Sequence, residues 1–261
     1  MKVIIIISSI IAISLATDYC DPKICTNKPN PTFPHIGCGA SGKLASTCPS
    51  DGEYIELTDE HKKIILEEHN KLRNKIANGE ESGFEPAKKM VTMKWNDELA
   101  YLANLNALGC DFEHDKCRNT DDFAYAGQNL AVRSSTGDFP ETKKALRDAI
   151  RDWYSEYEIS TQSDIDKYPL DTNGRMIGHF TQVVNGLAGE VGCGVTRYTD
   201  SSSGTAFKTF QLSCDYSRTN LVNQAIYAAG KTASDCKTGT NPNYPALCSE
   251  NEKVDPNYLK F

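Results

Sequence analysis

Histidine is the side chain best suited to acid–base or metal chemistry near neutral pH, and two of the five histidines in this sequence stand out. His69 lies in a segment where Ile65, Leu72 and Ile76 recur at helical spacing, and His179 opens the apolar run HFTQVV. A lone histidine on an apolar face is usually a hydrogen-bonded core residue, but two of them with acidic or amide neighbours form a candidate pocket. The other histidines are expected at ordinary surface or loop positions: His35, His61 and His114.

Three readings are open for this pair. Imidazole binds zinc and copper, so His69 and His179 are candidate metal ligands, with water completing the coordination shell. Nucleophilic catalysis is disfavoured, because the sequence has no Gly-x-Ser-x-Gly turn and its cysteines are expected in disulfides. The third reading, which we favour, is a buried hydrogen-bond network that fixes the shape of the site, and Arg73 can join it.

The first residues indicate the compartment. Lys2 precedes an apolar run over residues 3–13, and Ser14-Leu15-Ala16 is typical of a signal-peptide cleavage site, so residues 1–16 are predicted to be removed. The run is too short to span a membrane, and no second run of spanning length follows. Loss of Lys2 changes the formal net charge from −7 to −8, which makes nucleic acid or an anionic membrane surface a poor partner.

Ten cysteines, all in the mature part, predict five disulfides in an exported chain. None has CxxC spacing, and the sequence by itself does not choose among the pairings. The chain divides into a cysteine-rich arm (17–57), a central domain (58–220) with most of the periodic segments, and a C-terminal extension (221–261).

The central domain reads as α+β. Helices are predicted from a Thr58 cap to Gly79, from Asn96 to Gly109, and from near Pro140. Residues 191–195 alternate like a strand, and residues 207–216 are rich in aromatic and β-favouring residues. The turn-forming stretch TDSSSGT between them predicts an antiparallel hairpin with its two cysteines close enough to pair. For residues 178–184 we favour one or two turns of helix over a strand.

Seven short motifs occur in the order seen in the CAP superfamily of cysteine-rich secretory, antigen 5 and pathogenesis-related proteins. They are EEHNKLRN, WNDELA, HDKCRNT, AGQNLA, GHFTQVV, VGCGV and QLSCDYS, and they cover about residues 55–220. Each motif alone is weak, but seven in order are a strong signal. The cysteine-rich arm, HDKCRNT and the glutamine of AGQNLA resemble the insect antigen 5 branch, and the tail resembles fly members from salivary gland or haemolymph.

This resemblance implies a three-layer α-β-α sandwich with a central antiparallel sheet. It also implies that the arm is bridged to the loop after the second helix. The pairings it implies are Cys20–Cys38, Cys25–Cys117, Cys48–Cys110, Cys193–Cys214 and, as the remaining pair, Cys236–Cys248.

The family cavity joins two histidines and two acids, and by motif these fall on His69, Glu98, Gln128 and His179. Gln128 is a departure, since an amide cannot act as a base and is a poor metal ligand. Asn185 is another, because much of the family has tryptophan there, and a looser wall is expected. Glu98 with a histidine could activate water, although the sequence shows no oxyanion hole.

The resemblance implies a secreted, non-enzymatic protein of saliva or venom, a monomer or weak dimer, and a candidate allergen. Its expected partner is a host plasma protein or a small lipid, and the loops over residues 134–139 and 160–175 are the candidate contact surfaces. Two alternatives are a zinc- or copper-dependent redox or hydrolytic enzyme using His69 and His179, and a carrier of sterol or fatty acid, which would need an apolar groove between helices.

Overall fold

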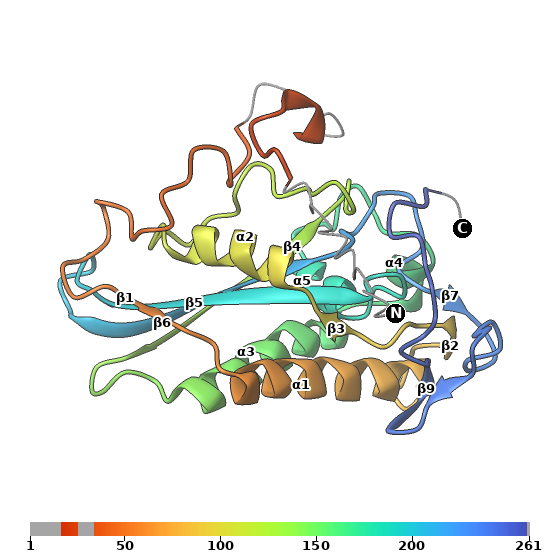
Figure 1. The fold of residues 1–261 in the computed structure, drawn as a ribbon. Coiled ribbons are helices and arrows are strands. Elements are labelled where there is room, and N and C mark those ends of the chain that lie inside the picture. The colour runs from red at the N-terminus through yellow and green to blue at the C-terminus, as the bar shows by residue number, and fades with distance from the viewer. Residues whose placement is uncertain (1–16, 26–33, 260–261) are drawn as a thin grey trace, which may run out of the picture.

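The computed structural model describes residues 17–25 and 34–259, so the predicted signal peptide and its cleavage position lie outside the described residues. The middle layer is a sheet in the order β1 (Glu53–Ile55), β5 (Glu190–Asp200), β6 (Phe207–Tyr216), β4 (Gly127–Ser135) (Figure 1). These neighbours are antiparallel, and β3 (Lys94–Trp95) adds in parallel to the start of β5. The predicted hairpin is β5–β6.

Helices cover both faces of this sheet. In Figure 1, α2 lies on one side and α1 and α3 on the other, which gives the three layers that the resemblance implies. Gly178–Val183 forms a helix of six residues, in agreement with the one or two turns of helix favoured from the sequence. The helices are η1 (Pro22–Cys25), α1 (Asp59–Ala77), α2 (Asp97–Ala107), α3 (Thr142–Ser155), η2 (Glu156–Ile159), α4 (Gln162–Asp166) and α5 (Gly178–Val183).

Capping residues set where the long helices begin. Thr58 caps α1 and Asn96 caps α2, as predicted, because each side chain accepts a backbone N–H of the first turn. The third helix begins later than expected from Pro140. Glu141 is its cap, since the carboxylate accepts two backbone N–H groups of the first turn.

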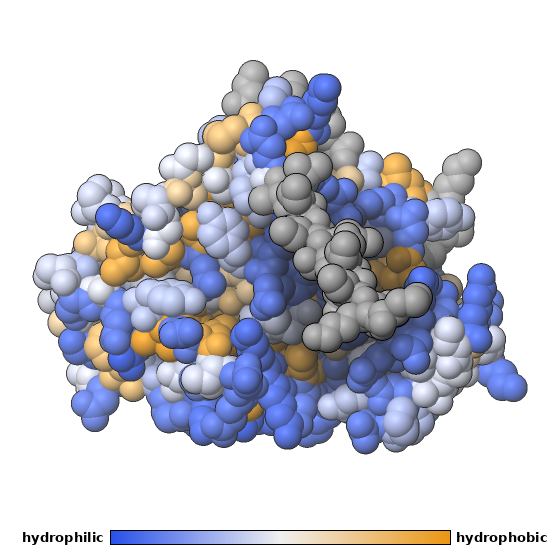
Figure 2. All heavy atoms as spheres, in the orientation of Figure 1, coloured by the Kyte–Doolittle hydropathy of each residue, from blue (hydrophilic) through white to orange (hydrophobic). Residues whose placement is uncertain are grey.

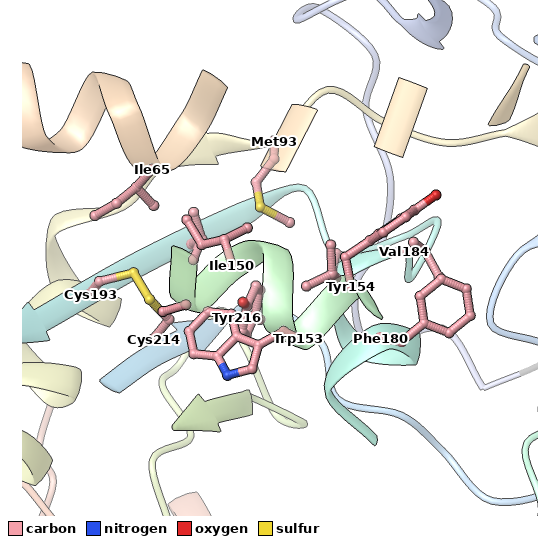
Figure 3. Close-up of a cluster of buried hydrophobic side chains, with 14 of the residues drawn as sticks. Ile65, Met93, Ile150, Trp153, Tyr154, Phe180, Val184, Cys193, Cys214 and Tyr216 are labelled. Atoms are coloured by element: carbon pink, nitrogen blue, oxygen red, sulfur yellow. A yellow bond between two sulfur atoms is a disulfide. The ribbon is translucent and has the colours of Figure 1, made fainter. Parts of the chain in front are cut away.

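The main apolar core lies between the sheet and the layer of α1, α3 and α5 (Figure 3). Cys193, Cys214 and Tyr216 reach it from the strands, Ile65 from α1 and Trp153 from α3, and all five are buried. Because side chains alternate along a strand, the neighbours of these residues face α2 instead.

The α2 face of the sheet has a different composition. Gly192 and Gly194 lie directly beneath α2: a Cβ at Gly192 would lie 2.0 Å from the Ala100 nitrogen, and one at Gly194 would lie 2.5 Å from Asn104 Cα. Only glycine permits this approach. Three buried polar side chains of β6 share this face: Gln211, Ser213 and Asp215.

Disulfides and two small ladders attach the arm and the extension to the domain. The five bridges are those that the resemblance implies: Cys20–Cys38, Cys25–Cys117, Cys48–Cys110, Cys193–Cys214 and Cys236–Cys248. In the extension, β7 (Ala228–Ala229) pairs with β2 (Ala87–Lys89), and β8 (Thr240–Asn241) pairs with β9 (Tyr244–Cys248). Four extension residues belong to the main core, so this segment packs as part of the domain: Ile226, Tyr227, Ala246 and Leu247.

Within the described ranges, no helix combines the length and apolar character that crossing a membrane requires.

Candidate functional site

A pocket of about 380 Å³ opens beside the start of α5. Its walls come from the loop after α2, the start of β4, residues 168–182 and the turn after β6. Of the four residues predicted to share a cavity, Gln128 and His179 line this pocket, whereas His69 and Glu98 are not part of its lining. The pocket gains a histidine that the sequence reading left as an ordinary loop residue, His114.

Glu156 fixes the position of His179. Its Oε2 accepts the backbone N–H groups of His179 and Phe180, at 3.0 and 3.1 Å, and its Oε1 lies 2.7 Å from His179 Nδ1. The carboxylate therefore satisfies two N–H groups at the start of α5, which lack partners within the helix, and orients the ring as well. Because a carboxylate oxygen only accepts, Nδ1 is the ring nitrogen that donates to Glu156.

Gln128 holds His114 in the corresponding way. The Gln128 amide nitrogen donates to Asp115 Oδ2 at 2.7 Å and to Asp215 Oδ1 at 2.9 Å. The amide oxygen is thereby turned towards His114, whose Nδ1 lies 2.8 Å away and donates to it. Desolvation lowers the pKa of His114, which favours the neutral ring with its lone pair on Nε2.

Gln128 is hydrogen-bonded to a buried cluster of charged side chains, Asp115, Arg118 and Asp215. Asp215 is fully buried, and burial raises its pKa well above the usual range, while the Arg118 guanidinium, with Nε 3.8 Å from Oδ1, acts in the opposite direction. Arg118 also pairs with Asp115 at 3.0 Å. One guanidinium thus serves two carboxyl groups, and Asp215 is the one that tends to keep its proton.

The structure separates His69 from the pocket, which corrects the predicted histidine pair. His69 Nδ1 lies 2.8 Å from Ile65 O and Nε2 lies 2.9 Å from the Tyr216 hydroxyl, so both ring nitrogens are engaged in the core. Burial lowers its pKa to about 4. The centroid of the Trp153 ring lies 6.4 Å from that of His69 and 6.3 Å from that of His179. His69 cannot ligate a metal without breaking a core hydrogen bond, so the predicted His69–His179 metal site is not formed.

Glu98 lies under the N-terminal arm instead of in the pocket. Its Oε1 accepts the Thr17 hydroxyl at 2.6 Å and the Tyr19 hydroxyl at 2.9 Å. The physical reason is that Glu98 belongs to α2, whereas α5 packs in the core on the other face of the sheet.

Two further expectations about the site need revision. Among the described residues Arg73 pairs with no carboxylate: it donates to the carbonyls of Val91, Val183 and Asn185, each at 2.8 Å. Asn185 is buried, and its amide nitrogen reaches Thr219 O at 3.4 Å. The wall at this position is therefore hydrogen-bonded and packed, where a looser wall was expected.

The residues missed by sequence reasoning differ in how visible they were. His114 and Asp115 stand in HDKCRNT and Asp215 in QLSCDYS, so the motifs already contained them. Glu156 had no such signal, because it lies between the apolar positions Trp153 and Tyr157 of the third predicted helix and resembles a solvent-facing acid.

The pocket offers two imidazoles to a cation, His114 and His179. In the described part of the chain, no group of three or more His, Cys, Asp or Glu side chains is placed to hold a metal ion. A cation bound here would take two nitrogen ligands and complete its shell from water, which is an incomplete donor set for tight binding.

Comparison with known proteins gives consistent results. A family model described as CAP, the cysteine-rich secretory protein family, matches residues 66–216. Venom allergen-1 of Aedes aegypti is 38% identical over 249 residues, covering 95% of this chain and 94% of the relative. Antigen 5 like allergen Cul n 1 of Culicoides nubeculosus is 44% identical over 202 residues, covering 75% and 90%. The crystal structure of NaASP2 with Zn²⁺ matches with a TM-score of 0.61 at 26% identity, covering 77% of this chain and 100% of that one.

Proposed function

This chain belongs to the cysteine-rich secretory protein family, in its antigen 5-like branch, and we propose that it is a secreted protein that acts by binding a host protein. The signal-like first 16 residues and five disulfides support secretion, since disulfides persist in oxidising compartments. The names of the two allergen relatives support a role in venom or saliva and mark the chain as a candidate allergen.

The chemistry of the pocket favours binding over catalysis. All ten cysteines are in disulfides, and the described pocket lining contains no serine. The imidazoles of His114 and His179 therefore have no Ser or Cys nucleophile beside them to activate. Each ring is also oriented by a hydrogen bond from its Nδ1 to one side chain, which fixes the shape of the pocket wall.

The observation that carries the proposal is the exposure of three large apolar side chains in residues 159–176, the segment that leads into the pocket wall: Ile159, Leu170 and Met176. Their exposed fractions are 49%, 84% and 66%, and Met176 itself lines the pocket. Exposed apolar groups that flank a polar pocket mark interaction surfaces.

The segment that carries these side chains is held rigidly. Arg175 makes a bidentate pair with Asp164, at 2.7 and 2.8 Å, and also donates to Ile159 O at 3.0 Å. The backbone of Tyr168 donates to Gln224 O at 2.8 Å. A preformed surface loses little conformational entropy on binding, which suits recognition of a protein.

The test is capture from vertebrate plasma followed by affinity measurement with the purified captured partner. The double variant Leu170→Asp/Met176→Asp is expected to bind at least ten-fold more weakly, because it places two charges in the apolar contact. Phe112→Asp is the matched control, since Phe112 is 54% exposed on a different loop. Equal affinity of the double variant and the wild type, with both folded by circular dichroism, would overturn this assignment of the surface.

A second candidate function is cation binding, favoured by the two imidazoles of the pocket. The NaASP2 structure was determined with Zn²⁺, and this chain places His114 and His179 in one pocket. Titration calorimetry with zinc chloride is expected to show weak binding that disappears in His114→Ala and in His179→Ala. His61→Ala is the control and should bind as the wild type does; equal loss in all three variants would indicate non-specific binding.

Lipid carriage has a specific observation of its own. An apolar groove of about 480 Å³ lies between the arm and α2, with Leu44, Tyr101, Leu105 and Leu108 in its walls. It adjoins one helix, whereas the sequence reading required a groove between helices. Solvent extraction of the secreted protein followed by mass spectrometry tests this candidate, and a lipid-free extract would count against it.

A further inference from the structure

Glu98 is an acid whose surroundings lack a cation. In the described part of the chain it accepts two hydroxyl hydrogen bonds, from Thr17 and Tyr19, and both reach the same oxygen, Oε1. No lysine or arginine of the described ranges lies within ion-pair distance of it, whereas its neighbour Asp97 pairs with Lys62 at 3.5 Å. Glu98 is thus a half-buried carboxylate that accepts hydrogen bonds only from neutral donors and lacks the cation that would form an ion pair with it.

Thr17, one of the two donors to Glu98, is the first residue after the predicted cleavage position. Thr17 Oγ1 is separated from its own backbone nitrogen by only three bonds, and it lies 2.6 Å from Glu98 Oε1. The contact therefore brings the backbone nitrogen of Thr17 close to the carboxylate. In the uncleaved chain that nitrogen is a neutral amide.

We propose that removal of residues 1–16 creates an α-ammonium on Thr17 that binds the Glu98 carboxylate and fixes the start of the arm on α2. Hydrolysis of the Ala16–Thr17 peptide bond by a signal peptidase consumes one water and leaves a carboxylate on Ala16 and an ammonium on Thr17. Cleavage thus supplies the cation that Glu98 lacks. The ligand of this site is the chain's own new N-terminus, a primary ammonium.

The contact has a consequence for the surface nearby. Tyr19, the second donor to Glu98, stacks on His35 at 4.8 Å and on Tyr101 at 6.1 Å between ring centroids. Tyr101 is also a wall of the apolar groove between the arm and α2. Figure 2 shows hydrophobic residues gathered among polar ones over α2 and β1, where this groove lies. Fixing the N-terminus through Glu98 therefore steadies one side of the groove.

The experiment compares the α-amine pKa in three secreted, fully oxidised proteins: the wild type, Glu98→Gln and Asp97→Asn. N-terminal sequencing comes first and is expected to read Thr17; a different first residue would overturn the proposal. The pH dependence of α-amine modification, followed by peptide mass spectrometry, then gives the pKa of the Thr17 amine. An unperturbed α-amine titrates near 7.7–8.0, and we expect the wild-type value to lie about half to one unit higher.

Glu98→Gln keeps the shape and the oxygen acceptor but removes the charge, so its Thr17 amine should titrate at the ordinary value. Asp97→Asn is the matched control and should titrate as the wild type does. Identical pKa values in the wild type and in Glu98→Gln would overturn the proposal. Because a pKa is read from folded protein, loss of stability in a variant does not imitate the expected result. Hydrogen exchange at Tyr19 gives an independent readout: N-terminal acetylation should speed it two-fold or more in the wild type and leave Glu98→Gln unchanged, and an equal effect in both would contradict the proposed ion pair.

Discussion

Replacing Gln128 with glutamate tests the electrostatics beneath the pocket. Gln128 is the position where the family pattern leads one to expect an acid. Here its amide nitrogen donates to both Asp115 and Asp215, and its oxygen accepts from His114. A carboxylate at this position could keep only the contact with the histidine, and it would face two other carboxyl groups. We therefore expect Gln128→Glu to destabilise the protein at neutral pH.

The new carboxyl group is either ionised or protonated in the folded protein, and each state lowers the free energy of unfolding. If the new carboxyl stays ionised, repulsion from a neighbouring carboxylate at about 4 Å costs about 4 kcal/mol at an effective dielectric constant of 20. If it takes up a proton, the cost at pH 7 is that of protonating a carboxyl group whose ordinary pKa is about 4.3, which is about 4 kcal/mol. The two routes cost nearly the same, so we expect the free energy of unfolding at pH 7 to fall by about 4 kcal/mol.

The sign of the pH dependence follows from the raised pKa. Below about pH 4 the new carboxyl is protonated in both folded and unfolded states, so this electrostatic loss is absent there. The loss grows as the pH rises and is complete above the folded-state pKa. Urea unfolding at pH 4, 5, 6 and 7, with the disulfides intact, measures it as a widening gap between the variant and the wild type.

Two controls isolate this electrostatic effect. Gln128→Met removes the hydrogen bonds without adding a charge, so its gap from the wild type should stay nearly constant with pH. Gln162→Glu repeats the chemical change at a half-buried surface position, where the amide donates to the exposed Asp166 at 2.7 Å, and should cost under about 1 kcal/mol because solvent screens such a pair. A Gln128→Glu gap that does not change between pH 4 and pH 7 would refute the reasoning.

Three further outcomes are expected for the core. Burial lowers the His69 pKa from 6.5 to about 4, so the wild type should lose about 3 kcal/mol of stability as the pH falls from 7 to 4, and urea titrations of His69→Gln should lack this component. Arg73→Met leaves three buried carbonyls without their donor and should lower the free energy of unfolding by about 3 kcal/mol or more; a loss below 1 kcal/mol in urea unfolding would contradict this role. Gly192→Ala places a Cβ 2.0 Å from the Ala100 nitrogen and should lower the melting temperature by more than about 5 °C, whereas Gly178→Ala, with nothing nearer than 3.7 Å, should change it little.

Local patterns were sufficient to place the elements. The caps at Thr58 and Asn96 predicted where two helices begin, and the β5–β6 hairpin followed from strand-like segments on both sides of a turn-forming stretch, because these signals act over a few residues. The start of the third helix was misplaced at Pro140. A proline suits a first-turn position, but the Glu141 carboxylate satisfies two N–H groups there and so decides the boundary.

The site was harder to predict, because the signal that singled out His69 also describes a core residue. Helical spacing identified the buried face of α1. A residue at the centre of that face, such as His69, is surrounded by core side chains and does not line a pocket. His114 has the opposite character: it lies in a loop between Cys110 and Cys117, which are bridged to the arm, and no periodicity marks it. Two covalent anchors hold such a loop in place without help from a helix or strand. In a disulfide-rich domain, a polar residue between two bridged cysteines is therefore a stronger candidate for a site than a histidine on an apolar stripe.

The amide at position 128 follows from the same cluster. Arg118 is shared between Asp115 and Asp215, so its single positive charge already faces two carboxyl groups. A third acid would leave the cluster with excess negative charge in a buried place, whereas an amide supplies two donors and remains neutral. Gln128 is therefore favoured while both aspartates are present beneath the pocket. Because burial favours the protonated form of Asp215, the repulsion on a new carboxylate at 128 comes from Asp115, which pairs with Arg118. Combining Gln128→Glu with Asp115→Asn should accordingly recover most of the stability lost in Gln128→Glu alone, and strictly additive losses in urea unfolding would show that the two positions do not interact.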